Sequence, residues 1–148
     1  MRIQNGVLIT IENGNFPCGY VDFENGVITR YGDMNTSPAY EGEVLDAKGG
    51  YILPGLIDAH THIGICEEGI GPMGWDCNEA TEPATPAMRA MDGVNPQDPS
   101  IRKAREAGIT TVGIAPGSAN VIGGQIAAMK LAGETVEEMN IVPQIQNA

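Results

Sequence analysis

Residues 51–62 read YILPGLIDAHTH and contain the strongest signals for the fold. Pro54 and Gly55 interrupt regular structure within this stretch. The apolar part that follows, Leu56 and Ile57, is too short and too β-branched for a helix. We therefore predict a buried strand that ends near His62.

A helix and a second strand follow further along the chain. Residues 98–108 read DPSIRKAREAG, with Asp98 suited to the N-cap, Pro99 to the first helical position and Gly108 to the stop. Residues 109–115 are rich in β-branched side chains and predict a strand. Strand, crossover helix and strand in this order are typical of a parallel sheet, so the predicted fold class is α/β.

The N-terminal third predicts a small β module. Its short β-type runs are residues 6–11, 19–23, 27–31 and 43–47. Asn25 and Gly26 suit a tight hairpin turn between the second and third runs. Gly49 and Gly50 suit a hinge, so we divide the chain into residues 1–50 and 51–148.

The remainder of the second part contains a long segment without periodicity. Residues 64–99 predict a loop, and a loop of this length is usually functional or mobile. Within it, residues 88–91 suit one helical turn. Residues 125–131 predict a further strand, and residues 135–138 match a capping box that opens a short helix before Pro143. No element is predicted after Pro143.

The charge balance excludes two classes of partner. Nineteen acidic residues against eight Lys and Arg give a net charge of −11, which repels a phosphate backbone or an anionic membrane.

The start of the chain has no apolar run of signal-peptide length, and the uncharged residues 107–129 are interrupted by Gly, Pro and polar side chains. We expect a cytoplasmic protein that binds neither nucleic acid nor membrane.

The three cysteines are an odd number without a close-spaced pair. This spacing argues against a disulfide framework, so we expect reduced thiols at Cys18, Cys66 and Cys77. In an alternative reading, Cys66 and Cys77 join two histidines in a Cys₂His₂ zinc site, although the close knuckle of such sites is missing.

Three side chains near the end of the first predicted strand can meet on one face. Asp58, His60 and His62 alternate along the chain, and alternate side chains of a strand point the same way. Two neutral imidazoles in this arrangement can hold one Zn²⁺ or a related divalent ion. Taken alone, the tripeptide also fits an ordinary polar cluster.

The wider context resembles a known family. Residues 52–64, ILPGLIDAHTHIG, resemble the first barrel strand of the metal-dependent amidohydrolase superfamily, and residues 106–112, EAGITTV, look like its next helix-to-strand passage. The resemblance extends to about Met139. The segments similar to the imidazolonepropionase-related branch are residues 78–79, 83–86, 92, 95–96 and 116–125.

The resemblance implies a fold, a cofactor and an activity. Residues 51–148 would form the first βα units of an incomplete (β/α)₈ TIM-type barrel, because a whole barrel takes about 250 residues. His60 and His62 would bind one or two divalent ions, with zinc the first choice, and Asp58 would be a buried supporting carboxylate. The activity implied is hydrolysis of an amide or cyclic amide C–N bond of a small molecule by a metal-activated water.

The rest of the family's site has no match in this chain. The family takes its bridging carboxylated lysine or glutamate, two further histidines and a catalytic aspartate from later strands, but this chain has two histidines in all. Lys130 lies too early in the strand order to be the bridging lysine. Asp92 and Asp98 lie in or beside a loop and not at the end of a late strand, so the catalytic residue is unknown. We expect an N-terminal portion of a longer hydrolase, inactive alone, that forms a homo-oligomer or binds the remaining barrel segment. The alternative is a non-catalytic metal-binding or assembly module.

Three weaker candidates lie in the loops. Asn120 and Gln125 belong to a glycine-rich stretch after the second strand, where barrel loops contact substrate, although a turn built for close packing is the alternative. Glu67 and Glu68 could approach a metal or simply be solvated. Trp75 could line a pocket or pack the loop down, and the sequence does not choose.

Overall fold

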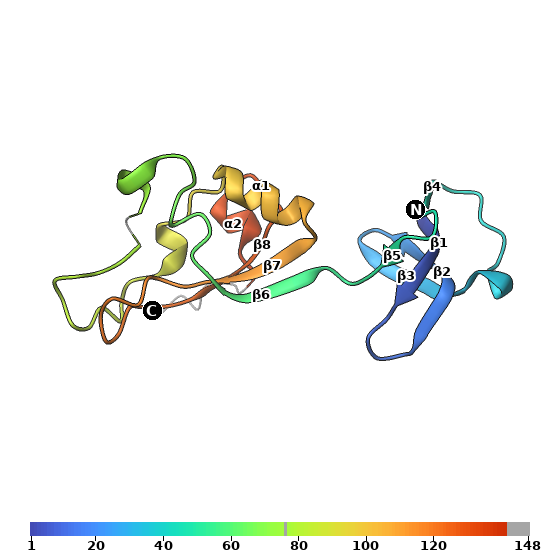
Figure 1. The fold of residues 1–148 in the computed structure, drawn as a ribbon, viewed down its shortest axis with the longest axis horizontal. Helices are drawn as coiled ribbons and strands as arrows, with labels where there is room; N and C mark the ends of the chain where they lie inside the picture. The colour runs from blue at the N-terminus through green and yellow to red at the C-terminus, as the bar shows by residue number, and fades with distance from the viewer. Residues whose placement is uncertain (76, 142–148) are drawn as a thin grey trace. The chain divides into compact units, whose positions relative to one another are not determined.

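A computed structural model describes residues 1–75 and 77–141 of the chain. The chain folds into two compact units, Met1–Pro54 and Gly55–Ala148. Each unit contains its own sheet, and strands outnumber helices, so the fold class is mixed α/β (Figure 1). The residues after Pro143, for which no element is predicted, lie outside the described residues. None of the helices in the described ranges has the length and apolar character of a membrane span.

The first unit is a five-stranded sheet in the order β3-β2-β1-β4, with β5 also paired to β1. Its elements are β1 (Arg2–Ile9), β2 (Asn15–Glu24), β3 (Val27–Asp33), the 3-10 helix η1 (Met34–Thr36), β4 (Val44–Asp46) and β5 (Tyr51–Ile52). β2 and β3 are antiparallel, and both turn residues take positive φ, 51° at Asn25 and 76° at Gly26. The predicted hairpin is confirmed.

A buried ion pair lies inside this first unit. Arg2 donates from Nε to Asp22 Oδ1 at 2.7 Å and from Nη2 to Oδ2 at 3.0 Å. The two side chains are only 3% and 2% exposed. The guanidinium also lies over the rings of Tyr20 and Tyr40, at 4.5 and 4.6 Å from their centroids. The charge is therefore both paired and covered by aromatic rings.

The strand predicted to end near His62 is present, while the two residues at the start of the same stretch, Tyr51 and Ile52, join the other sheet. β5 pairs in parallel with β1 of the first unit, whereas β6 (Leu56–Thr61) belongs to the second. The break falls at Pro54 and Gly55. Proline has no N–H to give to a ladder, which ends the first pairing there.

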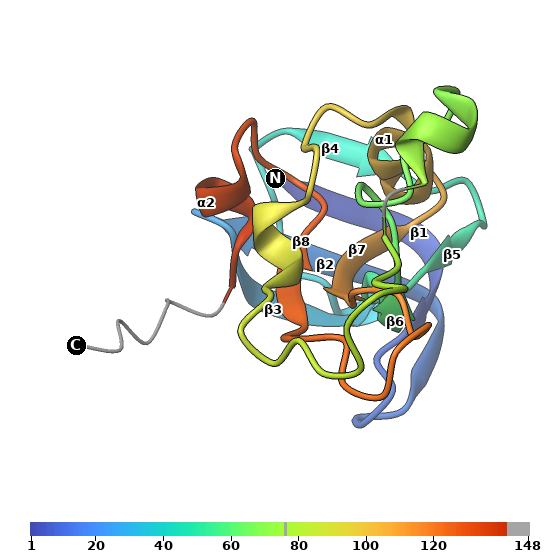
Figure 2. The ribbon, with the colours of Figure 1, turned by 90° about the vertical axis from the view of Figure 1, so that its left-hand side faces the viewer.

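The second unit contains a three-stranded sheet in the order β6-β7-β8. Its other elements are the 3-10 helices η2 (Gly71–Gly74) and η3 (Ala90–Asp92), α1 (Pro99–Glu106), β7 (Ile109–Ile114), β8 (Ala127–Lys130) and α2 (Val136–Met139). β6 and β7 are parallel with α1 between them in the chain, and this predicted unit is confirmed (Figure 1, Figure 2). β8 runs antiparallel to β7, unlike successive barrel strands, because residues 115–126 supply no crossover helix.

The residues predicted to begin and end the helix over residues 98–108 do so in α1. Asp98 caps α1 by accepting from Ser100 N at 2.7 Å, Pro99 begins the helix, and Gly108 has a φ of 94° just after its end. The helical turn predicted at residues 88–91 appears as η3, which begins at Ala90.

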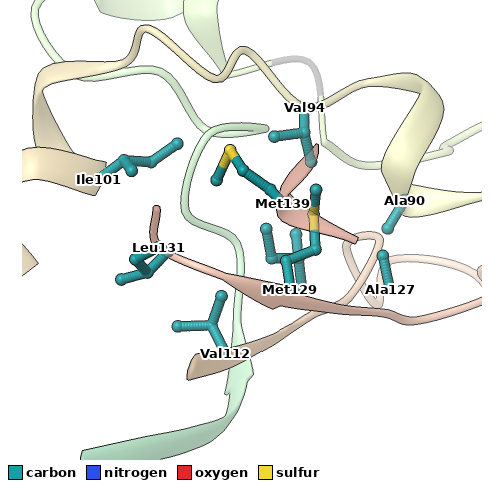
Figure 3. Close-up of a cluster of buried hydrophobic side chains, with 9 residues drawn as sticks. Ala90, Val94, Ile101, Val112, Ala127, Met129, Leu131 and Met139 are labelled. Atoms are coloured by element: carbon teal, nitrogen blue, oxygen red, sulfur yellow. The ribbon is translucent and has the colours of Figure 1, made fainter. Parts of the chain in front are cut away.

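The core of the second unit lies between β7, β8 and the two helices. Ile101 of α1, Val112 of β7, Met129 of β8 and Met139 of α2 point into one interior (Figure 3). The buried cluster comprises Ala90, Val94, Ile101, Val112, Ile114, Ala127, Met129, Leu131 and Met139.

The described part of this core contains no residue of β6. Leu56 and Ile57 are 53% and 72% exposed, so the expectation that this strand is buried is wrong. β6 is the outer strand of its sheet, paired on one side by β7. A parallel strand needs cover on both faces to be buried, and the elements described in this unit do not supply it.

Candidate functional site

Two imidazoles lie together where β6 ends. His60 is the next-to-last residue of the strand, and His62 is the first residue after the strand. Their ring centroids are 5.4 Å apart and their planes meet at 80°. One residue separates them in an extended chain, so both side chains project from the same face. We call His60 and His62 the histidine pair.

A backbone carbonyl fixes the orientation of one ring. His62 Nδ1 lies 2.8 Å from the carbonyl oxygen of Ala115, the residue after β7. A carbonyl oxygen only accepts hydrogen bonds, so Nδ1 carries the proton and Nε2 keeps its lone pair. This is the arrangement in which an outer partner orients a metal-binding histidine. The sequence gives no sign of Ala115, because the contact comes from its main chain.

Asp58 contacts the main chain of the histidine pair. Its Oδ1 accepts from the backbone N of His60 at 3.1 Å, and the side chain is half-buried instead of buried. The carboxylate therefore holds the backbone at the end of β6, while no described contact joins it to an imidazole.

The geometry of the histidine pair suits a shared divalent ion. Two imidazoles bound to one tetrahedral ion, with metal–nitrogen distances near 2 Å, have ring centroids roughly 5 Å apart. The observed separation of 5.4 Å matches that spacing. Within residues 1–75 and 77–141, no three His, Cys, Asp or Glu side chains converge, so the histidine pair contributes two protein ligands.

A disulfide joins Cys66 and Cys77, whose Cα atoms are 5.9 Å apart. The expectation of reduced thiols is wrong for these two residues, while Cys18 is free and exposed. The loop after β6 folds back so that Cys66 faces Trp75 in an antiparallel bridge, which brings Cys77 within reach. Since the two sulfurs are bonded to each other, the alternative Cys₂His₂ site is not formed.

Asn120 and Gln125 bind the neighbouring loop. Asn120 Nδ2 donates to Glu82 O at 3.1 Å and to Thr85 Oγ1 at 3.0 Å, and Gln125 Nε2 donates to Pro86 O at 3.2 Å. These contacts favour the close-packing alternative over substrate binding. Asn120 also borders a shallow hollow of about 470 Å³ lined by residues 79–83 and 119–121.

The acidic and aromatic candidates of the long loop have other contacts. Glu67 accepts from Asn95 Nδ2 at 2.7 Å, and Glu68 pairs with Lys103. Trp75 is 71% exposed, so most of its ring surface is not packed against the loop. Neither carboxylate forms part of a described cluster with the histidine pair.

Glu79, which the sequence analysis does not single out as a site residue, lies at the edge of the hollow beside Asn120. Glu79 accepts from the Oγ1 and N–H of Thr81 and from Glu82 N, which lowers its pKa to about 2. The carboxylate stabilises its own turn.

No protein-family model matches the chain. The amidohydrolase tasK of Hapsidospora irregularis is 38% identical over 117 residues, 77% of this chain and 12% of tasK. An imidazolonepropionase of Phocaeicola vulgatus is 46% identical over 50 residues, 33% of this chain and 12% of that protein.

A solved amidohydrolase from Thermotoga maritima has the same fold. It is 40% identical, with a TM-score of 0.86 over 95% of this chain and 36% of its own. The chain thus spans about an eighth of the two relatives and about a third of the solved structure. In sequence and fold the chain is therefore similar to amidohydrolases, and the resemblance that its motifs predicted is confirmed.

Proposed function

We propose that this chain is the N-terminal portion of a metal-dependent amidohydrolase that hydrolyses an amide or cyclic amide C–N bond of a small molecule with a metal-activated water. The observation that carries the proposal is the histidine pair at the end of β6, with His62 Nδ1 held by Ala115 O at 2.8 Å. The relatives named amidohydrolase and imidazolonepropionase support the same chemistry.

In this proposal His60 and His62 hold one divalent ion, with zinc as our choice. Such an ion lowers the pKa of a water and polarises the carbonyl to be attacked. The chain's own contribution is to position its ligands. Ala115 O keeps the proton on Nδ1 of His62 and leaves Nε2 free, and Asp58 holds the backbone N–H of His60.

The remaining ligands and the general acid or base would come from a later part of the enzyme. A catalytic zinc usually takes three protein ligands, whereas this chain contains two histidines. The parallel unit of β6, α1 and β7 supports the second unit, which begins at Gly55, as the first part of a TIM-type barrel, with the first unit as a separate β module. We propose that this chain is inactive without the later strands and that its catalytic residue is not among its own.

A second candidate is a non-catalytic metal-binding or assembly module. The shortage of ligands and the exposed outer strand β6 favour it. In that role the histidine pair would stabilise the chain or its assembly with a second copy or with the remaining barrel segment.

Zinc titration of the full chain, read by native mass spectrometry and calorimetry, tests the metal site. We expect one zinc ion per chain, with affinity about 100-fold weaker in His60→Ala and in His62→Ala. Asp92→Asn is the control, because this exposed carboxylate pairs with Arg89 and not with a histidine. Equal zinc binding in all four proteins would refute the site. Hydrolysis of amide substrates by this chain alone would refute its inactivity.

A further inference from the structure

The Cys66–Cys77 disulfide connects a segment hydrogen-bonded to the His62 main chain with a segment hydrogen-bonded next to the carbonyl that holds the His62 ring. On one side, Cys66 N donates to His62 O at 2.9 Å. On the other side, Gly117 N donates to Cys77 O at 2.6 Å, two residues after Ala115, whose carbonyl holds the ring. The disulfide therefore closes a ring of contacts around His62. We call Cys66, Cys77 and Gly117 the cystine brace.

The third member of the cystine brace has no room for a side chain. A Cβ on Gly117 would lie 2.6 Å from Cys77 O and would also collide with the side chain of Asn78. The close approach of these two backbones therefore depends on glycine at this position.

The opposite side of the ring is already held by the sheet. Ala115 N donates to Thr61 O at 2.9 Å, which continues the pairing of β6 with β7. Without the disulfide, the segment between the cysteines would be tied at its base by Glu67 N donating to Gly74 O and by the bridge between Cys66 and Trp75. The covalent bond thus links the loop after His62 to the segment after β7, in addition to the pairing of the sheet.

We propose that the cystine brace is a redox-responsive positioning device for His62, which tightens metal binding by the histidine pair when the disulfide forms. This proposal rests on the proposed function. The oxidant is a low-molecular-weight disulfide: the Cys66 and Cys77 thiols give two electrons and two protons, one S–S bond forms, and the oxidant's S–S bond breaks to give two thiols. Both cysteines are half-buried, so a small disulfide can reach them.

The test uses the full chain carrying Cys18→Ser, which removes the free thiol of the first unit and leaves the pair under study. The protein is compared after oxidation by glutathione disulfide and after reduction by a phosphine. Without metal, we expect the Gly117 amide to exchange about 10- to 100-fold more slowly in the oxidised protein. With zinc, we expect the dissociation constant to be about 10-fold lower in the oxidised protein.

Gly117→Ala in the same background keeps both cysteines but removes the close approach. We expect it to weaken zinc binding in the oxidised protein toward the reduced value, whereas Cys77→Ser should match the reduced protein in both measurements.

Equal Gly117 exchange in the two redox states would overturn the cystine brace. Redox-dependent exchange with unchanged zinc affinity would overturn its control of the metal site. Absence of zinc binding in both states, with exchange still redox-dependent, would refute the metal site of the proposed function while supporting the redox-dependent ordering of the cystine brace at Gly117.

Discussion

Asp22 makes the stability of the first unit depend on pH. Hydrogen bonding from Arg2 holds the pKa of Asp22 below its usual range against the opposing effect of burial, and Arg30 adds its charge at 3.2 Å. A carboxyl whose pKa is lower in the folded state stabilises the fold at pH values above its unfolded pKa, about 3.9. That contribution is lost as pH falls below about 4 and through the folded pKa.

We predict that the urea midpoint of the first unit stays level from pH 7 to 5 and falls below pH 4. In Asp22→Asn, the free energy of unfolding at pH 7 should be about 3 kcal/mol lower, because Arg2 is left buried without its anion. The urea midpoint of this variant should therefore already be lower at pH 7. NMR amide signals of β2 during urea titrations at pH 3 to 7 measure both effects. An equally steep acid transition in Asp22→Asn would show that another group is responsible.

Some of the candidate site could be predicted residue by residue, and some could not. The spacing of His60 and His62 in an extended chain is enough to bring their rings to one face. Ala115 acts through its carbonyl, which every residue has, so its identity carries no signal. The pairing of Cys66 with Cys77 depends on the path of a loop that lacks periodicity, and spacing does not encode that path.

Gly113 sets the distance between β6 and β7. A Cβ at this position would lie 2.5 Å from Ala59 O, a backbone atom that cannot rotate away. We predict that Gly113→Ala separates the two strands, lowers the unfolding free energy of the second unit by about 1 to 3 kcal/mol and weakens zinc binding. Chemical denaturation and zinc titration measure the two changes.

Gly93→Ala is the matched control for that substitution. Its added Cβ would make an ordinary contact at 3.7 Å with Ala90 O, and its φ is −102°. We expect both measurements to stay at the wild-type values. If Gly93→Ala lowers the unfolding free energy and the zinc affinity as much as Gly113→Ala does, strand spacing does not explain the effect of Gly113→Ala.

Elements with strong local signals could be predicted, and elements defined by distant partners could not. Asn25 and Gly26 encode their turn, and Asp98 and Gly108 mark the limits of α1 through the groups that cap it. The assignment of β5 to the first sheet depends on β1, some 45 positions earlier in the chain. The antiparallel direction of β8 follows from the lack of a crossover helix, and no local pattern specifies it.

The outer strand β6 makes the whole chain prone to association. Leu56 and Ile57 present apolar surface at 53% and 72% exposure on a strand that is paired on one side. Exposed apolar edge strands add further strands from other chains. We predict that the chain associates with increasing concentration and that Ile57→Lys shifts it toward monomer, as measured by size-exclusion chromatography with light scattering.

Val121→Lys controls for the added charge, because Val121 is 86% exposed in a segment outside the strands. This variant should associate like the wild type. A wild-type monomer that persists over a 100-fold range of concentration would contradict the prediction.

The pairing pattern of the first sheet has a consequence for synthesis on the ribosome. β1 receives β2, β4 and β5, and β3 adds to β2, so all of these pairings lie within the first 52 residues. Domains tend to fold as units in the order in which they are made. The first sheet can therefore close before the second unit has left the exit tunnel, and β6 with the histidine pair at its end emerges after the partners of β1.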